Sequence, residues 1–308
     1  MAISSLPQLD RFFLTDAGLE TDILFNKGID LPYFSSVTLF TSDASLDVLD
    51  AYYRDFLDLA RRMGTGLVLE SATWRASPHW AGPLGLSLAE LDALNDAAIG
   101  LLRGLRAEYA DVPVVISGCL GPRGDGYDPG TVMAAAEAEA YHAHQAGVLA
   151  AAGVDMLAAI TMTNIPEAVG VTKAAQALGL PVAISFTVET DGRLPTGDAL
   201  GDAISAVDAA TGGYPAYYMI NCAHPAHFDA VLDAGAAWTA RIGGVRANAS
   251  RLSHAELDVM TELDIGDPAD LAARHRALIE RFPQIRVVGG CCGTDLRHVA
   301  AIAEACLA

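Results

Sequence analysis

Residues 285–293 read Ile-Arg-Val-Val-Gly-Gly-Cys-Cys-Gly, a short β-rich run that ends in two glycines and an adjacent pair of cysteines. A second stretch has the same form, because the apolar run Ala216–Ile220 leads directly into Asn221 and Cys222. Parallel α/β proteins keep their chemistry where buried strands run out into loops. These two stretches therefore predict an α/β fold with a functional site at the carboxyl ends of its strands.

The two stretches together offer three thiolates, Cys222, Cys291 and Cys292. Three sulfur ligands can hold a zinc ion and leave a fourth position open for a substrate. Neighbouring residues on a strand point to opposite faces, so Cys291 and Cys292 can share a metal only if the backbone turns sharply, which the flanking glycines permit. Buried inert thiols and a strained vicinal disulfide are the alternatives.

Short β-rich runs bounded by Gly, Pro or Asp alternate with longer helical patterns along the whole chain, which predicts eight successive βα units. A (β/α)8 TIM barrel accounts for this count, and a doubly wound open sheet is the alternative. No Gly-x-Gly-x-x-Gly follows an early strand, which weakens a nucleotide-binding version. The predicted strands are Phe12–Asp16, Gly66–Ser71, Val112–Ser117, Met156–Ile160, Pro181–Thr187, Ala216–Asn221, Trp238–Arg241 and Arg286–Gly289.

Helix start signals support several of the intervening helices. Ser45 is expected to cap the first, Ser87 begins a capping box with Glu90, and Asp267 precedes a proline at a first helical position. The predicted helices are Leu46–Met63, Leu88–Tyr109, Val132–Ala152, Pro166–Leu178, Leu200–Ala210, Ala226–Ala234, Pro268–Arg281 and Leu296–Leu307.

The composition favours one large enzyme domain over residues 1–308. The chain has 308 residues, 52% of them hydrophobic, and no long Pro/Gly/Ser linker divides it. Five cysteines, two of them adjacent, argue against a secreted disulfide framework, and residues 1–10 show no leader pattern. No apolar run has the length of a membrane span. A net charge of −19 disfavours nucleic acid and anionic membranes as partners, so we expect a cytoplasmic, soluble protein that acts on small molecules.

Other candidate residues lie at the predicted strand ends. Asp16 ends the first strand, so its carboxylate can enter the mouth of the barrel while the amides of Ala17 and Gly18 meet a ligand carboxylate; a helix cap is the alternative role. Glu20 and Glu70 are further acidic candidates, with a solvated rim as the alternative. Asn221 can orient the cysteine site through its amide or serve in a turn.

The segment after the second strand suggests a place for a cationic ligand. The face of Trp74 attracts a sulfonium or quaternary ammonium group, although Trp74 can equally pack in the core. Arg75 can bind a ligand carboxylate. Cys119 follows the third strand and is expected near the same mouth, whereas Cys306 lies on an apolar C-terminal helix and is expected in the core.

Five segments of the chain match, in order, those of a known enzyme family. They are Asp16–Thr21, Ala72–Ser77, Ser117–Pro122, Asn221-Cys222 and Gly289–Gly293. On these segments the sequence resembles the homocysteine S-methyltransferases. The resemblance implies a (β/α)8 barrel with Zn²⁺ held by Cys222, Cys291 and Cys292, and an aspartate, here Asp16, that helps to bind the amino group of homocysteine. Substrate-binding positions would include Ala17, Gly18, Glu70, Ser71, Trp74, Arg75 and Asn221.

The chain departs from the family at the fourth strand. Family members show a glutamate there, after an apolar strand and before Thr or Tyr, whereas this sequence reads Ala158-Ala159-Ile160-Thr161. The family glutamate contacts the amino-acid acceptor, so Ile160 puts homocysteine in doubt. Either another acid such as Glu70 substitutes for it, or the acceptor is a different thiol.

The leading hypothesis is a zinc-dependent thiol methyltransferase that makes methionine from homocysteine. The chain has no room for folate and cobalamin modules, so the donor is expected to be S-methylmethionine, S-adenosylmethionine, a betaine or a related onium compound. The same chemistry on a different thiol and a non-catalytic zinc-binding barrel are the alternatives, and homo-oligomerisation is possible.

Overall fold

A computed structural model describes residues 6–307 of the chain. Residues 1–5, the first half of the N-terminal stretch in which the sequence shows no leader pattern, lie outside the described residues, as does residue 308. None of the helices in the described part is long and apolar enough to cross a membrane.

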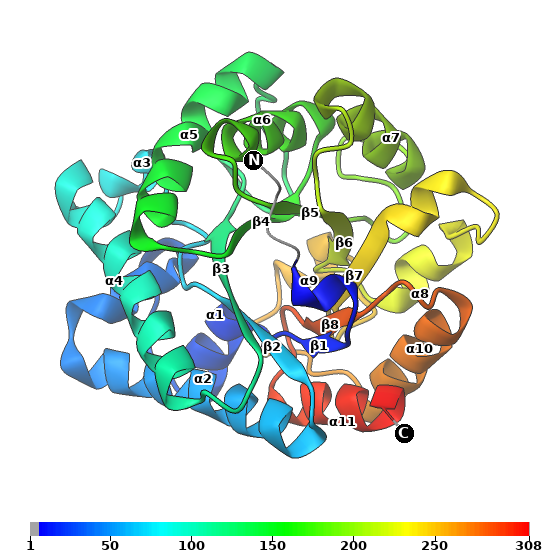
Figure 1. Cartoon of the computed structure of the whole chain (residues 1–308), viewed down its shortest axis with the longest axis horizontal. Helices are drawn as coiled ribbons and strands as arrows, with labels where there is room; N and C mark the ends of the chain where they lie inside the picture. The colour runs from blue at the N-terminus through cyan, green and yellow to red at the C-terminus, as the bar shows by residue number, and fades with distance from the viewer. Residues whose placement is uncertain (1–5, 308) are drawn as a thin grey trace.

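Within residues 6–307, eight parallel strands pair in sequence order and close on themselves, since β1 pairs with both β2 and β8. Figure 1 shows the helices as a ring around these strands. The predicted (β/α)8 barrel is confirmed, and the open sheet is excluded. The strands are β1 Phe13–Leu14, β2 Gly66–Glu70, β3 Val114–Leu120, β4 Met156–Met162, β5 Val182–Phe186, β6 Tyr217–Asn221, β7 Ile242–Ala247 and β8 Val287–Gly290.

The larger helices agree with the sequence-based expectations to within a few residues, and the short ones, α1, α3 and α9, lie in the loops between strands and helices. The helices are α1 Leu19–Thr21, α2 Asp43–Met63, α3 Pro78–Ala81, α4 Leu88–Glu108, α5 Ala135–Ala152, α6 Ile165–Leu178, α7 Leu200–Thr211, α8 Pro225–Phe228, α9 His254–Leu257, α10 Pro268–Arg281 and α11 Leu296–Leu307.

Two of the predicted caps are confirmed and one is wrong. Ser87 and Glu90 form a reciprocal capping box at α4, and the Asp267 side chain accepts a hydrogen bond from a backbone amide at the start of α10. The cap of α2 is Ser42 rather than Ser45, because Ser42 is extended and its side chain accepts the amide of Ser45. Ser45 therefore lies inside the first turn. The helix predicted over Ala226–Ala234 is also shorter, and ends as α8 at Phe228.

The seventh strand was predicted in the wrong place. Residues 237–241 form a 3₁₀ helix, and β7 begins at Ile242. Its two glycines, which resemble a loop in the sequence, are required by close packing: a Cβ at Gly243 would lie 2.9 Å from the Tyr217 Cβ, and one at Gly244 would lie 3.0 Å from Met219 side-chain atoms. The shift moves Arg246 onto a strand, level with Asn221 of β6 and Gly289 of β8.

The apolar residues form two layers, as a TIM barrel requires. One layer fills the barrel and includes Phe13, Val68, Met156 and Met219. The other packs the outer faces of the strands against the helices. Ile160 belongs to the inner layer, so its side chain faces the barrel interior, just below the mouth.

Candidate active site

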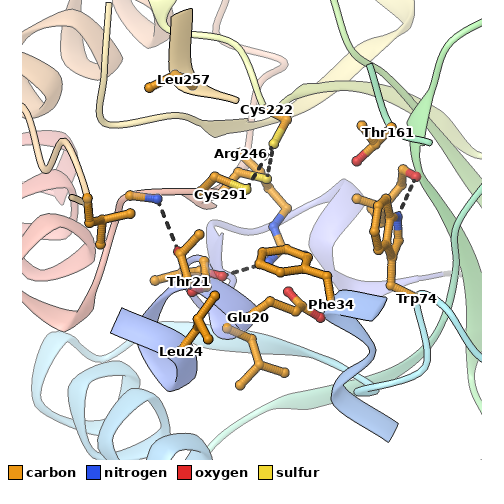
Figure 2. Close-up of a pocket in the computed structure, with 18 of the residues that line it drawn as sticks. Glu20, Thr21, Leu24, Phe34, Trp74, Thr161, Cys222, Arg246, Leu257 and Cys291 are labelled. Carbon is orange, nitrogen blue, oxygen red and sulfur yellow. Dashed lines mark hydrogen bonds between the residues drawn. The ribbon is translucent and has the colours of Figure 1, made fainter. Parts of the chain in front are cut away.

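A cavity of about 390 Å³ opens at the carboxyl ends of the strands (Figure 2). Side chains from almost every strand end or following loop reach it, and all the substrate-binding candidates except Asn221 line it. The cavity holds seven acidic side chains against two basic ones. The acids are Asp16, Glu20, Glu70, Asp125, Asp258, Glu262 and Asp264, and the bases are Arg75 and Arg246.

The three cysteines of the sequence prediction meet on one wall of this cavity. Cys222 follows β6, and Cys291 and Cys292 follow β8. The Cys222 Sγ lies 2.9 Å from the Cys291 Sγ and 3.4 Å from the Cys292 Sγ, and all three sulfur atoms lie within 4.8 Å of one another. All three thiols are free, so the structure contains no vicinal disulfide.

The backbone after β8 turns sharply, as it must if Cys291 and Cys292 are to bind the same metal ion. Gly293 adopts a φ of +78°, which favours glycine, and Cys222 itself has a φ of +54°. A Cβ at Gly290 would lie 1.9 Å from the Thr294 Oγ1, so this turn packs too tightly for any side chain. Strained backbone at non-glycine residues such as Cys222 clusters at functional sites.

The cluster favours one thiolate among two thiols. The pKa of Cys291 lies well below its usual value, because its sulfur forms hydrogen bonds with Cys222 and Cys292, and the positive charge of Arg246 adds to this effect. Burial raises the pKa of Cys222, and the pKa of Cys292 is raised mainly by its contact with Cys222. Three sulfur atoms that share one negative charge form a ligand set suited to a soft or borderline metal ion.

Asn221 links the cysteines to the neighbouring strand ends. Its side-chain oxygen accepts hydrogen bonds from the Thr161 amide, at 2.9 Å, and from the Ser185 hydroxyl, at 2.6 Å. Its amide nitrogen lies 2.8 Å from the Thr161 Oγ1 and 3.7 Å from the Cys291 Sγ. Thr161 has a φ of +65°, so these bonds hold an unfavourable backbone conformation at the end of β4. The orienting role expected for Asn221 is consistent with this geometry.

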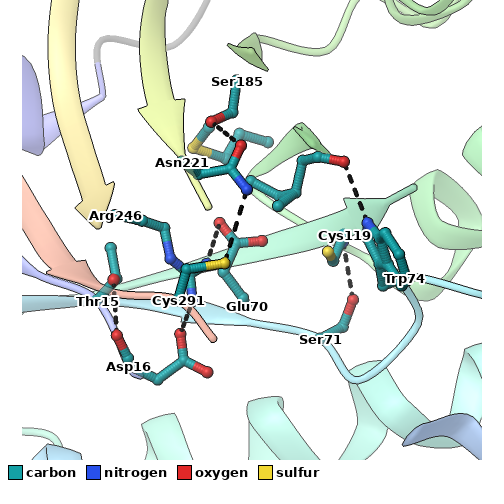
Figure 3. A network of polar contacts seen from close by, with 12 residues as sticks. Thr15, Asp16, Glu70, Ser71, Trp74, Cys119, Ser185, Asn221, Arg246 and Cys291 are labelled. Carbon is teal, nitrogen blue, oxygen red and sulfur yellow. Dashed lines mark hydrogen bonds and ion pairs between the residues drawn. The ribbon is translucent and has the colours of Figure 1, made fainter. Parts of the chain in front are cut away.

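The floor of the cavity is a charged cluster of three side chains (Figure 3). Arg246 extends from β7 and forms a salt bridge to Asp16 at the end of β1, and its Nη1 lies 3.9 Å from the Glu70 Oε1 at the end of β2. All three residues are buried. Asp16 and Glu70 were predicted site residues; Arg246 was missed because the seventh strand was misplaced.

The oxygen atoms of Asp16 and the amides beside it are already engaged. The Tyr52 hydroxyl lies 3.2 Å from the Asp16 Oδ2, while Arg246 binds Oδ1. The amide of Ala17 donates to the Tyr52 hydroxyl, and the amide of Gly18 donates to the Thr294 carbonyl. The amides that the sequence suggested for a ligand carboxylate therefore have partners within the fold.

Glu70 has an unused oxygen. Its Oε2 is buried and has no hydrogen-bond partner among residues 6–307. Burial raises the pKa of Glu70 to about 7, against the lowering effects of Arg246 and of the neighbouring Ser117 hydroxyl, and with a further upward contribution from Asp16. A buried carboxylate oxygen without a partner is costly, so the Glu70 carboxylate has unused capacity to accept a hydrogen bond.

Trp74, Arg75 and Ser71 line the cavity after β2. The Trp74 indole donates to the Ile160 carbonyl at 3.1 Å. The Arg75 guanidinium lies over the rings of Trp74 and Trp80, and donates to the Tyr33 carbonyl and the Asp125 carboxylate. The Ser71 hydroxyl accepts the amide of Cys119, which itself lines the cavity as expected.

Tyr127, on the loop after β3, is a second residue that the sequence did not indicate. Its hydroxyl lies 3.0 Å from the Cys222 Sγ and 3.7 Å from the Cys292 Sγ. Its ring stacks on His254, with centroids 3.7 Å apart, and His254 in turn contacts the Cys222 carbonyl at 2.8 Å. The Pro/Gly/Asp-rich loop of Tyr127 has no periodicity, so no sequence pattern could place it beside the cysteines.

Comparison with known proteins agrees with this architecture. The sequence model described as homocysteine S-methyltransferase matches residues 13–306. Two crystal structures of the homocysteine methyltransferase MmuM from Escherichia coli are similar in fold: the oxidized form has a TM-score of 0.76 at 21% identity and 98% coverage of each chain, and the metallated form has a TM-score of 0.72 at 20% identity and 96% coverage of each chain. No curated protein matches the chain. The chain belongs to the homocysteine S-methyltransferase family, as the resemblance indicated, and is a methyltransferase of that type.

Proposed function

We propose that this enzyme is a zinc-dependent thiol S-methyltransferase that transfers a methyl group from an onium donor to homocysteine, forming methionine. The single observation that carries the proposal is the meeting of three free cysteine sulfurs within 4.8 Å at the mouth of the barrel. The family match supports methyl transfer to a thiol.

The residues fit a metal ion of the proposed kind. Cys222, Cys291 and Cys292 supply three sulfur ligands on one side and face an open cavity on the other, which is the arrangement of a catalytic rather than a structural zinc site. The bound cation would lower the pKa of the acceptor thiol, so that the acceptor binds as a nucleophilic thiolate.

Glu70 supplies the carboxylate that Ile160 lacks. An acceptor ammonium group needs an anionic partner, and both oxygens of Asp16 are already bonded. Glu70 lines the same cavity, and its carboxylate can accept the ammonium hydrogen bond. We assign Asp16 to the positioning of Arg246.

The donor side of the cavity favours a cation. Acidic side chains outnumber basic ones on its lining, and the charge of Arg75 is already paired with Asp125. Trp74 is partly exposed at the cavity although Arg75 lies over its ring, and its aromatic surface can attract a sulfonium or quaternary ammonium group. In the transfer, the bond between the methyl carbon and the donor's onium atom breaks as the bond to the acceptor sulfur forms, and the donor leaves with one less positive charge.

A different thiol is the second candidate acceptor, because Ile160 stands where family members have the carboxylate that contacts the acceptor.

The experiment that tests the proposal incubates purified enzyme and zinc with S-methylmethionine and homocysteine. Methionine should form at a rate that depends on bound metal, and X-ray absorption should show sulfur ligands at about 2.3 Å. Full metal content in a Cys291→Ala/Cys292→Ala variant would refute the ligand assignment. Transfer to other thiols but not to homocysteine would select the second acceptor.

A chiral methyl donor tests the directness of transfer. A single displacement inverts the configuration of the methyl carbon, whereas two successive transfers restore it. We expect inversion, and net retention would overturn a direct mechanism.

A further inference from the structure

Arg246 is the most unusual feature of the cavity, because a buried arginine crosses the mouth of the barrel from β7 to β1 and β2 (Figure 3). Its Nε donates to the Gly290 carbonyl at 3.2 Å, and its Nη2 donates to Asp16 and the Ala17 carbonyl. Its Nη1 forms no hydrogen bond with any residue in the described range 6–307, and its contact to Glu70 at 3.9 Å is an ion pair too long for one.

Two neighbouring groups therefore lack a partner. Arg246 Nη1 offers donors and the Glu70 carboxylate offers an acceptor, and both residues line the cavity beside Cys291. We infer that Arg246 Nη1 binds the carboxylate of the acceptor, beside the ammonium group that Glu70 holds. This inference rests on the proposed function and names the residue that recognises the carboxylate.

Within the part of the chain that the structure describes, no other basic side chain on the cavity lining is free to hold a carboxylate. Arg75 is the only other basic residue on the lining, and it is held by Asp125 and the Tyr33 carbonyl. The amides of Ala17 and Gly18 are bonded to Tyr52 and Thr294. Arg246 is consequently the charged donor that remains on the lining.

The charges of the buried cluster bear on both ends of the acceptor. The cluster contains one guanidinium and two carboxyl groups, so its net charge is −1 when both carboxyls are ionised. An ammonium group neutralises this charge, whereas a carboxylate adds to it and needs the free donors of Arg246 Nη1 in order to bind. We therefore expect an amino-acid thiol to be preferred over analogues that carry either charge alone.

The first experiment needs no mutation. It compares kcat/KM for homocysteine, for γ-mercaptobutyrate, which lacks the amine, and for aminopropanethiol, which lacks the carboxylate, with one donor and zinc-loaded enzyme. Homocysteine should exceed each analogue at least about tenfold, since one charge-assisted hydrogen bond contributes roughly that factor. Equal use of homocysteine and aminopropanethiol would overturn the role of Arg246.

The second experiment uses Arg246→Lys, which keeps a positive charge for Asp16 but loses the forked second nitrogen. Values of kcat/KM for homocysteine and γ-mercaptobutyrate should fall about ten- to hundredfold, while that for aminopropanethiol should change less than about threefold. An equal loss for all three thiols would show a general structural role and overturn the inference.

Binding of methionine separates this inference from the proposed function. Methionine carries the same zwitterion but no thiol, so calorimetry reports recognition without chemistry. Arg246→Lys should raise the Kd of methionine by about the same factor as it lowers kcat/KM for homocysteine. If wild type methylates no thiol, the proposed function fails, and the methionine Kd still decides the role of Arg246; an unchanged Kd would overturn it.

Discussion

Glu70 makes the acceptor site sensitive to pH in a way that can be measured. Its pKa is raised to about 7, mainly by burial, with Arg246 opposing and Asp16 adding to the increase. A carboxyl group that becomes protonated as the pH falls through 7 can no longer pair with an ammonium group. Use of homocysteine should therefore decline below neutral pH, and the decline should require Glu70.

The expected size follows from the ionised fraction of Glu70 in the free enzyme. With a pKa of about 7, roughly one tenth of the enzyme carries the carboxylate at pH 6 and roughly nine tenths at pH 8, and kcat/KM reports the free enzyme. The contribution of Glu70 to kcat/KM for homocysteine should rise about tenfold across this range.

Other groups at the site also titrate, so the assay uses a ratio. The kcat/KM for homocysteine is divided by that for γ-mercaptobutyrate at each pH, which cancels the titration of the thiol and of the cysteine site. The ratio should rise about tenfold from pH 6 to pH 8 in wild type and stay flat in Glu70→Gln. A flat ratio in wild type, or the same rise in Glu70→Gln, would refute the assignment of the ammonium group to Glu70.

Three further predictions concern the cysteine turn. Cys292→Ala should lose both metal and transfer activity, whereas Cys306→Ala, on α11, should keep both, as metal analysis and product formation will show. Gly18→Ala should lower the free energy of unfolding by about 1–3 kcal/mol in urea titrations, because its Cβ would lie 2.4 Å from the Cys291 carbonyl oxygen; Gly100→Ala, with open space around it, should not. Tyr127→Phe removes the hydroxyl beside Cys222 and should weaken metal retention against a chelator about tenfold or more, and unchanged retention would exclude that contribution.

Much of the site could be predicted because its residues end strands that the sequence marks clearly. Glu70 and Asn221 close apolar runs of β2 and β6, and the adjacent cysteines follow β8. Carboxyl ends of parallel strands meet at one edge, so these residues had to converge once the barrel closed. Their meeting in one cavity is a consequence of topology rather than of any local contact.

The position of β7 and the site residues Arg246 and Tyr127 depend on tertiary packing, which no local sequence pattern reveals. Gly243 and Gly244 resemble a loop in sequence, yet they lie in β7. These strand positions are glycine because Tyr217 and Met219 leave no room for side chains. With the strand misplaced, Arg246 could not be seen as a residue of the barrel mouth. Tyr127 reaches the cysteines through the path of an irregular loop, and such paths are set by tertiary contacts.

The Ile160 difference and Arg246 belong to one rearrangement of charge. Ile160 packs with the inner apolar layer of the barrel and lines the cavity without a charge, and in the proposed site Glu70 supplies the anionic partner for an ammonium group instead. Arg246 then binds Asp16 and leaves one nitrogen beside Glu70, which makes a donor and an acceptor available together. In the proposed site these two side chains bind the two ends of an amino acid, which would account for the use of homocysteine without the family's glutamate.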